Sequence, residues 1–271
     1  MGAERPHQQA FTTRRVLHTK GIISPEYQHL EPQIRHAIAH FDNLGHKVGK
    51  GRRNMVKHMV VDGVALNVKS FKKPPIPNSL IYRYIRKSKA ERSYRYARHL
   101  LERGIGTPEP LAYLEQHVLK GLGESYYVSL HVQEDLTFRT LIDEPAYPGR
   151  EEILRQFARF THRLHEEKIH FLDHSPGNTL IVNENNGKYA FYLVDLNRMQ
   201  LGRSLGFEAR MKNFARLSAT KDMIEVISRE YALLSNYSQG KIYDRIGHYT
   251  EMNSRRRLRQ KQLNKRLGKY K

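Results

Sequence analysis

The segment at 169–198 restricts the fold of this 271-residue chain more than any other part. It places a carboxylate, Asp173, and an amide, Asn178, with four residues between them. Two apolar segments follow on either side of an Asn-Asn-Gly turn within 183–188, and a second carboxylate, Asp195, ends the second segment. Apolar strands around such a turn predict a tight β-hairpin. We expect this hairpin to return Asp195 to the neighbourhood of Asp173 and Asn178.

Two carboxylates and one amide oxygen at the mouth of a hairpin suit a Mg²⁺ ion held against phosphate oxygens. Their order, D-x-x-x-x-N followed by D, is the order used in protein kinases, where the first Asp receives the proton of the acceptor hydroxyl. On this interpretation Asp173 is the catalytic base, and Asn178 and Asp195 are the metal ligands. The alternative is that Asp-His-Ser-Pro-Gly-Asn forms only a turn, in which Asp and Asn cap backbone groups.

A lysine and two glycines upstream fit the same chemistry. Lys69 follows an apolar strand at 64–68, the second strand of a predicted hairpin. A lysine there can reach nucleotide phosphates, or can be a charge that protects an edge strand from aggregation. Gly49 and Gly51 precede the hairpin, and glycines let backbone N–H groups approach phosphates closely. Their spacing matches no standard phosphate-binding motif, so a plain turn remains an alternative.

Two further helices frame these residues. The first is predicted from about residue 78 or 79 to Arg103, where Gly104 and Pro108 stop it. Its sheet-facing residues recur at helical spacing: Ala90, Tyr94, Ala97 and Leu101. Glu91 lies beside this stripe, either to pair with Lys69 or as a surface acid. The second helix, at 151–168, is amphipathic and leads the chain into Asp173.

The rest of the chain supplies core residues, histidines and cations. At least one helix is expected within 207–236, with core residues Met211, Phe214, Ala215, Met223, Ile224, Val226, Ile227 and Leu233. His162 and His165 share a helix face, which raises a metal site as an alternative to a polar surface. Several cations beyond Asp195 are candidates to hold an anionic acceptor: Arg198, Arg203, Arg210, Lys212 and Arg216.

The formal net charge is +20, and residues 255–271 carry nine Lys or Arg and no acid, so 20 − 9 = +11 remains on the rest. Such a field attracts polyanions, which include nucleic acid, anionic lipid headgroups and phosphorylated glycolipid. The absence of cysteine excludes disulfides and thiol chemistry. Neither a membrane-spanning apolar run nor a secretory signal is apparent, so we expect a cytoplasmic protein.

With these residues in place, the chain resembles the bacterial lipopolysaccharide kinase family, which contains the Kdo kinases and related core kinases. The likeness covers about residues 24–235. Its segments are GRRNMVK (51–57), VKSF (68–71), SKAERSYRYARHLLERGIGTPEPLAYLE (88–115), DHSPGN (173–178) and LVDLNR (193–198). DHSPGN by itself would also suit aminoglycoside-type phosphotransferases.

The resemblance implies an α+β, bilobal protein-kinase-like fold, with an N-terminal antiparallel sheet plus helix and a mostly helical C-terminal lobe. It implies ATP and Mg²⁺ as cofactors, and phosphate transfer to a sugar hydroxyl, on Kdo or heptose, of the lipopolysaccharide inner core. Lys69 matches the nucleotide-phosphate lysine, Asp173 the catalytic base, and Asn178 and Asp195 the metal ligands. Glu91 falls in the lysine-pairing helix.

The chain departs from protein kinases at two motifs. Phe171-Leu172-Asp173 stands in place of His-Arg-Asp, so the histidine that supports the catalytic loop is missing or is replaced by His170. Asp195-Leu196-Asn197 stands in place of Asp-Phe-Gly, which puts protein-kinase-style loop switching in doubt.

Four segments are expected: a loose extension at 1–22, a nucleotide-binding lobe at 23–132, a catalytic lobe at 133–250, and a basic tail at 251–271. The acceptor would be the lipopolysaccharide core or a lipid A–Kdo glycolipid. The tail, either helical or a disordered arm, would contact an anionic membrane at the inner face of the cytoplasmic membrane.

Two alternatives remain. The first is a kinase of the same fold for another small-molecule or protein acceptor. The second is a catalytically silent scaffold that binds membrane or nucleic acid. Nucleic acid is disfavoured because the tyrosines of Tyr94-Arg-Tyr96 are two residues apart in a helix and cannot share one stacking face.

Overall fold

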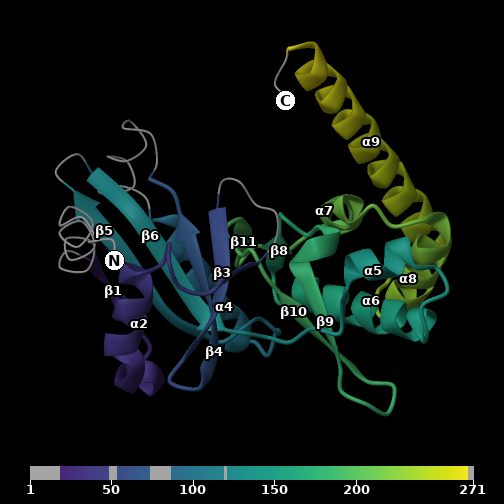
Figure 1. Cartoon of the computed structure of the whole chain (residues 1–271). Helices are drawn as coiled ribbons and strands as arrows, with labels where there is room; N and C mark the ends of the chain where they lie inside the picture. Colours follow the sequence, from purple (N-terminus) through teal and green to yellow (C-terminus); the bar gives the residue numbers. More distant parts are fainter. Residues whose placement is uncertain (1–18, 49–53, 74–86, 119–120, 268–271) are drawn as a thin grey trace. The chain divides into compact units, whose positions relative to one another are not determined.

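The computed structural model describes residues 19–48, 54–73, 87–118 and 121–267 (Figure 1). The chain forms two compact units. The first comprises Met1–Gly104 and Pro108–Val132, and the second comprises Ile105–Thr107 and Gln133–Lys271. Strands dominate the first unit and helices the second, which confirms the predicted α+β class.

The first unit is built on a six-stranded sheet in the order β1-β5-β6-β4-β3-β2, with every neighbouring pair antiparallel. Its strands are β1 (Thr19–Ile23), β2 (His46–Val48), β3 (Asn54–Val61), β4 (Val64–Phe71), β5 (Pro110–Val118) and β6 (Gly121–Leu130). The predicted hairpin of β3 and β4 forms, and Val56 lies opposite Lys69 in its register.

Helices cover both faces of this sheet. After a 3-10 turn at η1 (Pro25–Leu30), α2 (Glu31–Ala39) packs Ile34 into one hydrophobic core with Leu114 of β5. On α4 (Lys89–Leu101), the ring of Tyr94 lies 5.4 Å from the ring of Tyr113, also on β5. Because Tyr113 and Leu114 are consecutive in a strand, they point to opposite faces. The two helices therefore pack on opposite sides of the sheet.

Three sequence-based expectations for this unit need correction. Thr19–Ile23 form an edge strand paired with β5, because backbone pairing at an edge does not require the apolar side chains that the loose extension lacks. Helix α4 begins at Lys89, where the Ser88 side chain accepts a hydrogen bond from the backbone N–H of Glu91, so the predicted helix is not continuous through residues 87 and 88; its predicted start at 78 or 79 lies outside the described residues. Its buried stripe ends at Leu100, whereas Leu101 is only half-buried.

The second unit is mostly helical. Its helices are α5 (Phe138–Asp143), α6 (Arg150–Glu166), α7 (Phe207–Phe214), α8 (Lys221–Leu233) and α9 (Gln239–Arg266), with 3-10 turns at η2 (Pro176–Asn178) and η3 (Ala215–Leu217). Its strands are β7 (Leu136–Thr137), β8 (Ile169–Phe171), β9 (Thr179–Asn183), β10 (Tyr189–Leu193) and β11 (Met199–Leu201). They form one sheet in the order β10-β9-β7 and a pair, β11-β8.

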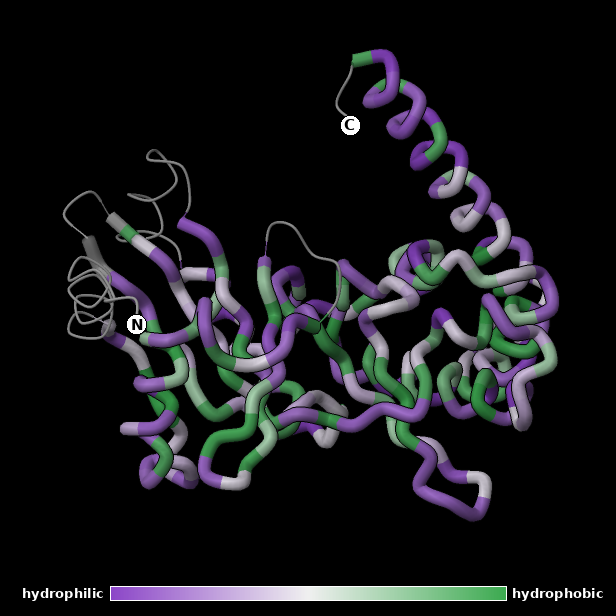
Figure 2. The backbone as a smooth tube through the Cα atoms, viewed as in Figure 1, coloured by the Kyte–Doolittle hydropathy of each residue, from purple (hydrophilic) through white to green (hydrophobic). Residues whose placement is uncertain are grey.

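One apolar core joins the helices of this unit with β7, β9 and β10. Phe157 of α6, Phe191 of β10 and Phe214 of α7 belong to it, and Figure 2 shows hydrophobic segments gathered where these elements meet. Most of the predicted core residues of this region are buried in it. Val226 is half-buried beside this core, and Leu233, at the end of α8, is exposed to solvent because the helix turns its other face to the core.

Helix α9 continues through the residue at which the basic tail was predicted to begin. It runs unbroken from Gln239 to Arg266, so the cations from Arg255 onward extend a helix that is anchored in the core by Ile242 and Ile246. Across the described ranges, no helix combines the length and the apolar composition that crossing a membrane would require.

Candidate active site

The hairpin of β9 and β10 joins the predicted site residues. The two strands pair antiparallel along their full length. Just beyond the pair, the backbone N–H of Val194 donates to the carbonyl of Asn178 at 3.0 Å. The Asn178 amide nitrogen donates in turn to the carbonyl of Asp173 at 2.8 Å. The structure therefore brings Asp173, Asn178 and Asp195 to one end of the hairpin, as the sequence predicts.

Asp195 adopts an unusual backbone conformation. Its φ is +60°, in the left-handed region that residues other than glycine occupy rarely. The Asn197 backbone N–H donates to the Asp195 carbonyl at 2.9 Å, and the Asn197 side-chain amide donates to the Asp195 carboxylate. A tight turn therefore fixes the carboxylate where the hairpin ends. Left-handed backbone held in this way is concentrated at functional sites.

The oxygen donors at this end of the hairpin fit a hard divalent cation. Because the Asn178 nitrogen is bound to the Asp173 carbonyl, Oδ1 is the atom of that amide that can serve as a ligand. Carboxylate and amide oxygens are ligands that Mg²⁺ accepts. No group of three or more His, Cys, Asp or Glu side chains in the described ranges is arranged to hold a metal. A cation here would therefore take further oxygens from its substrate or from water.

Two arginines flank Asp173. Nη1 of Arg198 lies 3.3 Å from Asp173 Oδ1, and Nη1 of Arg216 lies 3.4 Å from the same oxygen. Arg198 follows β10, whereas Arg216 belongs to η3, so the two side chains reach the carboxylate from separate elements. Both were among the cations predicted from the sequence to hold an anionic acceptor; the structure shows these two in contact with Asp173, and their role toward an acceptor stays a prediction.

The loop that carries Asp173 is supported from inside by Asn213, a residue that the sequence analysis missed. Asn213, on α7, is 5% exposed. Its Nδ2 donates to the carbonyl of Phe171 at 2.8 Å. Its Oδ1 lies 3.3 Å from Nδ1 of His174 and 3.2 Å from Nε2 of His165. One amide thus connects the loop to α6 and α7.

These contacts define the protonation of both histidines. Because Asn213 Oδ1 can only accept, His174 Nδ1 and His165 Nε2 are the protonated nitrogens. His165 Nδ1 then accepts from the Tyr231 hydroxyl at 2.8 Å. Burial lowers the pKa of His174 to about 4 and that of His165 to about 3. Both rings are therefore neutral at pH 7, and neither nitrogen of His165 remains for a metal.

Support of the loop falls to His174 rather than to His170. The His174 ring is fully buried, with centroids 5.7 Å from the Phe171 ring and 5.4 Å from the Phe157 ring. His170 instead lies opposite Gln200 in the β8–β11 pair and is only half-buried. The signal for Asn213 was weak, since an amide next to a lysine in a helix is usually interpreted as a surface residue.

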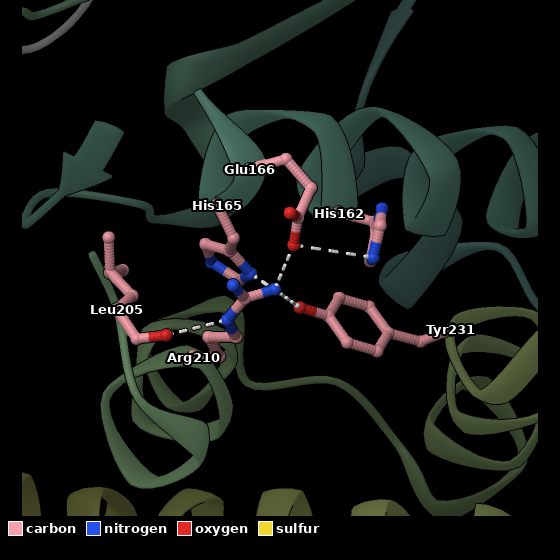
Figure 3. Close-up of polar contacts among 6 residues, drawn as sticks. All are labelled: His162, His165, Glu166, Leu205, Arg210 and Tyr231. Atoms are coloured by element: carbon pink, nitrogen blue, oxygen red, sulfur yellow. Dashed lines mark hydrogen bonds and ion pairs between the residues drawn. The ribbon is translucent and has the colours of Figure 1, made fainter. Parts of the chain in front are cut away.

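Arg210 is committed to an internal network and not to an acceptor (Figure 3). Its Nε donates to the Leu205 carbonyl at 2.7 Å, and its Nη1 contacts Glu166 and the Tyr231 hydroxyl. His162 approaches the same Glu166 carboxylate at 3.6 Å. Through Tyr231 this network continues to His165 and Asn213, so it supports the loop that carries Asp173 from the interior of the unit.

The predicted residues of the first unit are only partly described. Gly49 and Gly51 lie outside the described residues. Lys69 Nζ lies 5.4 Å from the centroid of the Phe71 ring. Glu91 pairs with Arg95 at 2.7 Å and with Lys87 at 3.8 Å. The pairing of Glu91 with Lys69 stays a prediction.

Comparisons with known proteins agree with this geometry. The solved structure titled "WaaP in complex with acyl carrier protein" is similar at a TM-score of 0.60 and 15% identity, covering 88% of this chain and 97% of that one. This likeness shows a protein-kinase-like fold. No curated protein sequence matches the chain. A sequence model described as the lipopolysaccharide kinase (Kdo/WaaP) family matches residues 47–237. Because that match spans more than half of the chain, the protein belongs to the lipopolysaccharide kinase (Kdo/WaaP) family and is a kinase.

Proposed function

We propose that this kinase transfers the γ-phosphoryl group of ATP, with Mg²⁺, to a sugar hydroxyl of the lipopolysaccharide inner core. The observation that carries the proposal is the hydrogen-bonded arrangement of Asp173, Asn178 and Asp195 at one end of the hairpin. Family membership supports lipopolysaccharide as the acceptor class and a nucleotide as the phosphate donor. Kdo and heptose are both compatible with this site.

In the proposed reaction, Asp173 orients the acceptor hydroxyl and receives its proton. The sugar oxygen forms a bond to the γ-phosphorus as the bond from that phosphorus to the ADP oxygen breaks, so the products are ADP and a sugar phosphomonoester. Asn178 and Asp195 would hold Mg²⁺, which neutralises charge on the phosphate oxygens when bound. The buried support from Asn213 keeps the Asp173 loop in one geometry, so the protein reorganises little during transfer.

The first unit offers a sheet face suited to the nucleotide. Asn67 and Lys69 are two residues apart on β4 and share one face, and His58 on β3 lies directly opposite Asn67. Among the described residues, Asn67 Oδ1 and His58 Nδ1 are buried and have no hydrogen-bond partner. Buried polar atoms of this kind usually have a partner. The donors and acceptors of a purine edge, with its phosphates toward Lys69, would supply one.

The test measures ATP consumption with Mg²⁺, with and without a lipid A–Kdo glycolipid, followed by mass spectrometry of the glycolipid. We expect a gain of one phosphate. Asp195→Ala should lower turnover by at least about 10³-fold, because it removes a metal ligand. Asp244→Ala, which removes an exposed carboxylate from α9, is the matched control and should retain activity. Unimpaired turnover in Asp195→Ala would refute the site.

The same experiment separates the alternative acceptors. Nucleotide binding without transfer to the glycolipid would keep the kinase and reject this acceptor in favour of another small molecule or a protein. Absence of nucleotide binding would favour the silent scaffold.

We also propose that the outer turns of α9 contact an anionic membrane surface, which would hold the enzyme at the inner face of the cytoplasmic membrane. All residues from Arg255 to Leu263 are exposed. Figure 2 shows the outer turns of α9 as mostly hydrophilic. Leu258, Leu263 and Leu267 are exposed among them. The leucines do not form one stripe, so charge rather than burial would dominate the contact.

Sedimentation with vesicles tests this contact. Wild-type protein should bind vesicles that contain anionic phospholipid and should not bind neutral ones, and added salt should release it. A variant with Arg256, Arg259 and Lys261 changed to Gln should lose most of the binding. Equal binding to neutral vesicles would refute the proposal. Binding instead to an acidic protein, such as the acyl carrier protein named with WaaP, would replace the membrane as the partner.

A further inference from the structure

The two arginine contacts on Asp173 have a consequence for the choice of acceptor. Arg198 and Arg216 both engage Oδ1 of a carboxylate whose side chain is 18% exposed, while their own side chains are 60% and 47% exposed. A guanidinium has five N–H donors in a planar fork, and each of these contacts uses one nitrogen. Both arginines therefore keep donor capacity toward solvent beside the proposed catalytic base.

This arrangement restricts Asp173 as a base, because two cations lie on one of its two carboxylate oxygens until the acceptor binds. A carboxylate that receives a hydroxyl proton needs an accessible oxygen, yet two cations approach Oδ1. Both arginine side chains are solvent-exposed, and exposed ion pairs are weak. Another anion can therefore replace Asp173 as their partner with little loss of free energy. Carboxylate and phosphate groups are the anions that bind guanidinium bidentately.

We propose that Arg198 and Arg216 form an acceptor clamp that exchanges Asp173 for an anionic group on the acceptor, next to the hydroxyl that reacts. The exchange would place the hydroxyl at Asp173 and uncover Oδ1 in the same step. This inference rests on the proposed function, in which Asp173 receives the hydroxyl proton. It restricts the substrate to acidic sugars or phosphorylated sugars, and it keeps the base covered when only nucleotide and water are present.

Two consequences are measurable. An acceptor whose anionic group has been neutralised should react poorly with wild-type enzyme, because the arginines then stay on Asp173. Removal of both arginines should strongly weaken the binding of the acidic acceptor. It should also raise the rate of ATP hydrolysis in the absence of acceptor, because Oδ1 is then accessible to water. A merely structural role for the arginines would produce neither effect.

The experiment compares wild type, Arg198→Ala, Arg216→Ala and the double variant on three acceptors: the lipid A–Kdo glycolipid, its carboxyl methyl ester, and its dephosphorylated form. The matched control is Arg229→Ala. Arg229 pairs with Glu225 at 3.3 Å and is 51% exposed, but it lies on α8. The acceptor form that loses activity identifies whether a carboxylate or a phosphate is the recognised anion.

For the double variant we expect kcat/KM on the glycolipid to fall at least about 100-fold, mainly through KM, and acceptor-free hydrolysis to rise about fivefold. Its activity on the recognised neutral form should change less than about threefold. Arg198→Lys should recover only part of the loss, because lysine cannot bind bidentately. Thermal unfolding should match wild type, since both side chains are exposed.

Equal losses on all three acceptors, or no loss on any, would overturn the clamp while leaving the proposed function in place. Failure of the wild-type enzyme to phosphorylate any form would overturn the proposed function, and the clamp with it. The two failures are therefore distinguishable in one data set.

Discussion

Replacing Asn213 with leucine should damage the catalytic loop without touching any residue that meets substrate. Leucine has a similar branched shape but its side chain makes no hydrogen bond. The change leaves three buried groups unpaired: the Phe171 carbonyl, the N–H of His174 and the N–H of His165. The Asp173 backbone lies two residues beyond Phe171, so losing the hydrogen bond to the Phe171 carbonyl should displace the proposed base.

The expected loss of stability follows from these contacts. An unpaired buried polar group costs about 1–3 kcal/mol. Three such groups would give about 3–9 kcal/mol if nothing moved, and relaxation of the loop should reduce this to about 3–4 kcal/mol. At about 2–4 °C per kcal/mol for a unit of this size, the midpoint of thermal unfolding should fall by about 6–16 °C.

Circular dichroism melts and steady-state kinetics provide the assay. We expect kcat to fall at least about tenfold, with a KM for ATP close to that of wild type. Asn253→Leu is the matched control, because Asn253 also donates one hydrogen bond to a backbone carbonyl of the same unit, that of Ala215 at 3.0 Å, but away from the loop. It should cost about 1 kcal/mol and leave kcat unchanged. A melt within 2 °C of wild type and unchanged kcat for Asn213→Leu would refute the role of Asn213.

Three further predictions follow from the same geometry. Because burial lowers the pKa of His165 to about 3, the folded chain stays neutral there while the unfolded chain takes up a proton near pH 6.5. The contribution of this residue to the free energy of unfolding should therefore be complete above about pH 7 and should fall toward pH 4 by up to about 1.4 kcal/mol per pH unit. The urea midpoint of His165→Gln should depend less on pH than that of wild type. Gly106→Ala should destabilise the protein by more than about 3 kcal/mol, because a Cβ there would lie 2.1 Å from the Phe191 carbonyl oxygen. Gly247→Ala, in an open stretch of α9, should instead stabilise it by about 0.5–1 kcal/mol. Urea unfolding of both variants measures the two changes. Arg210→Met should lower the free energy of unfolding by about 1–3 kcal/mol, mainly because the Leu205 carbonyl loses its hydrogen-bond donor and less because the exposed Glu166 loses its ion pair. The loss should therefore be nearly the same in 0.5 M salt. A loss that salt abolishes would contradict this account.

The chemistry-bearing residues were readable from local sequence. A hairpin is a local structure, so its strands, its turn and the return of Asp195 to Asn178 could be deduced from alternating apolar runs around Asn-Asn-Gly. The same holds for the amphipathic helix that leads into Asp173, since its apolar face repeats with the helical period.

Local patterns failed where a single hydrogen bond or an edge decided the structure. The start of α4 depended on the cap at Ser88, which apolar periodicity misses although Ser88 and Glu91 have the S-x-x-E spacing of a helix start. The strand at Thr19–Ile23 depended on an open edge of β5 supplied from about ninety residues further along the chain. Leu233 is apolar, but it lies outside the buried stripe of α8, which turns its other face to the core.

By itself, the sequence determined that Asp173, Asn178 and Asp195 meet at one end of a hairpin, because motif spacing and hairpin formation are local; the role of Lys69 stays a prediction. Only the tertiary structure decided what surrounds Asp173. Arg198, Arg216 and Asn213 arrive from elements 25 to 43 residues away, and which side chain reaches a given oxygen depends on how those elements pack. Sequence separation carries no information about such contacts, since packing alone brings them together.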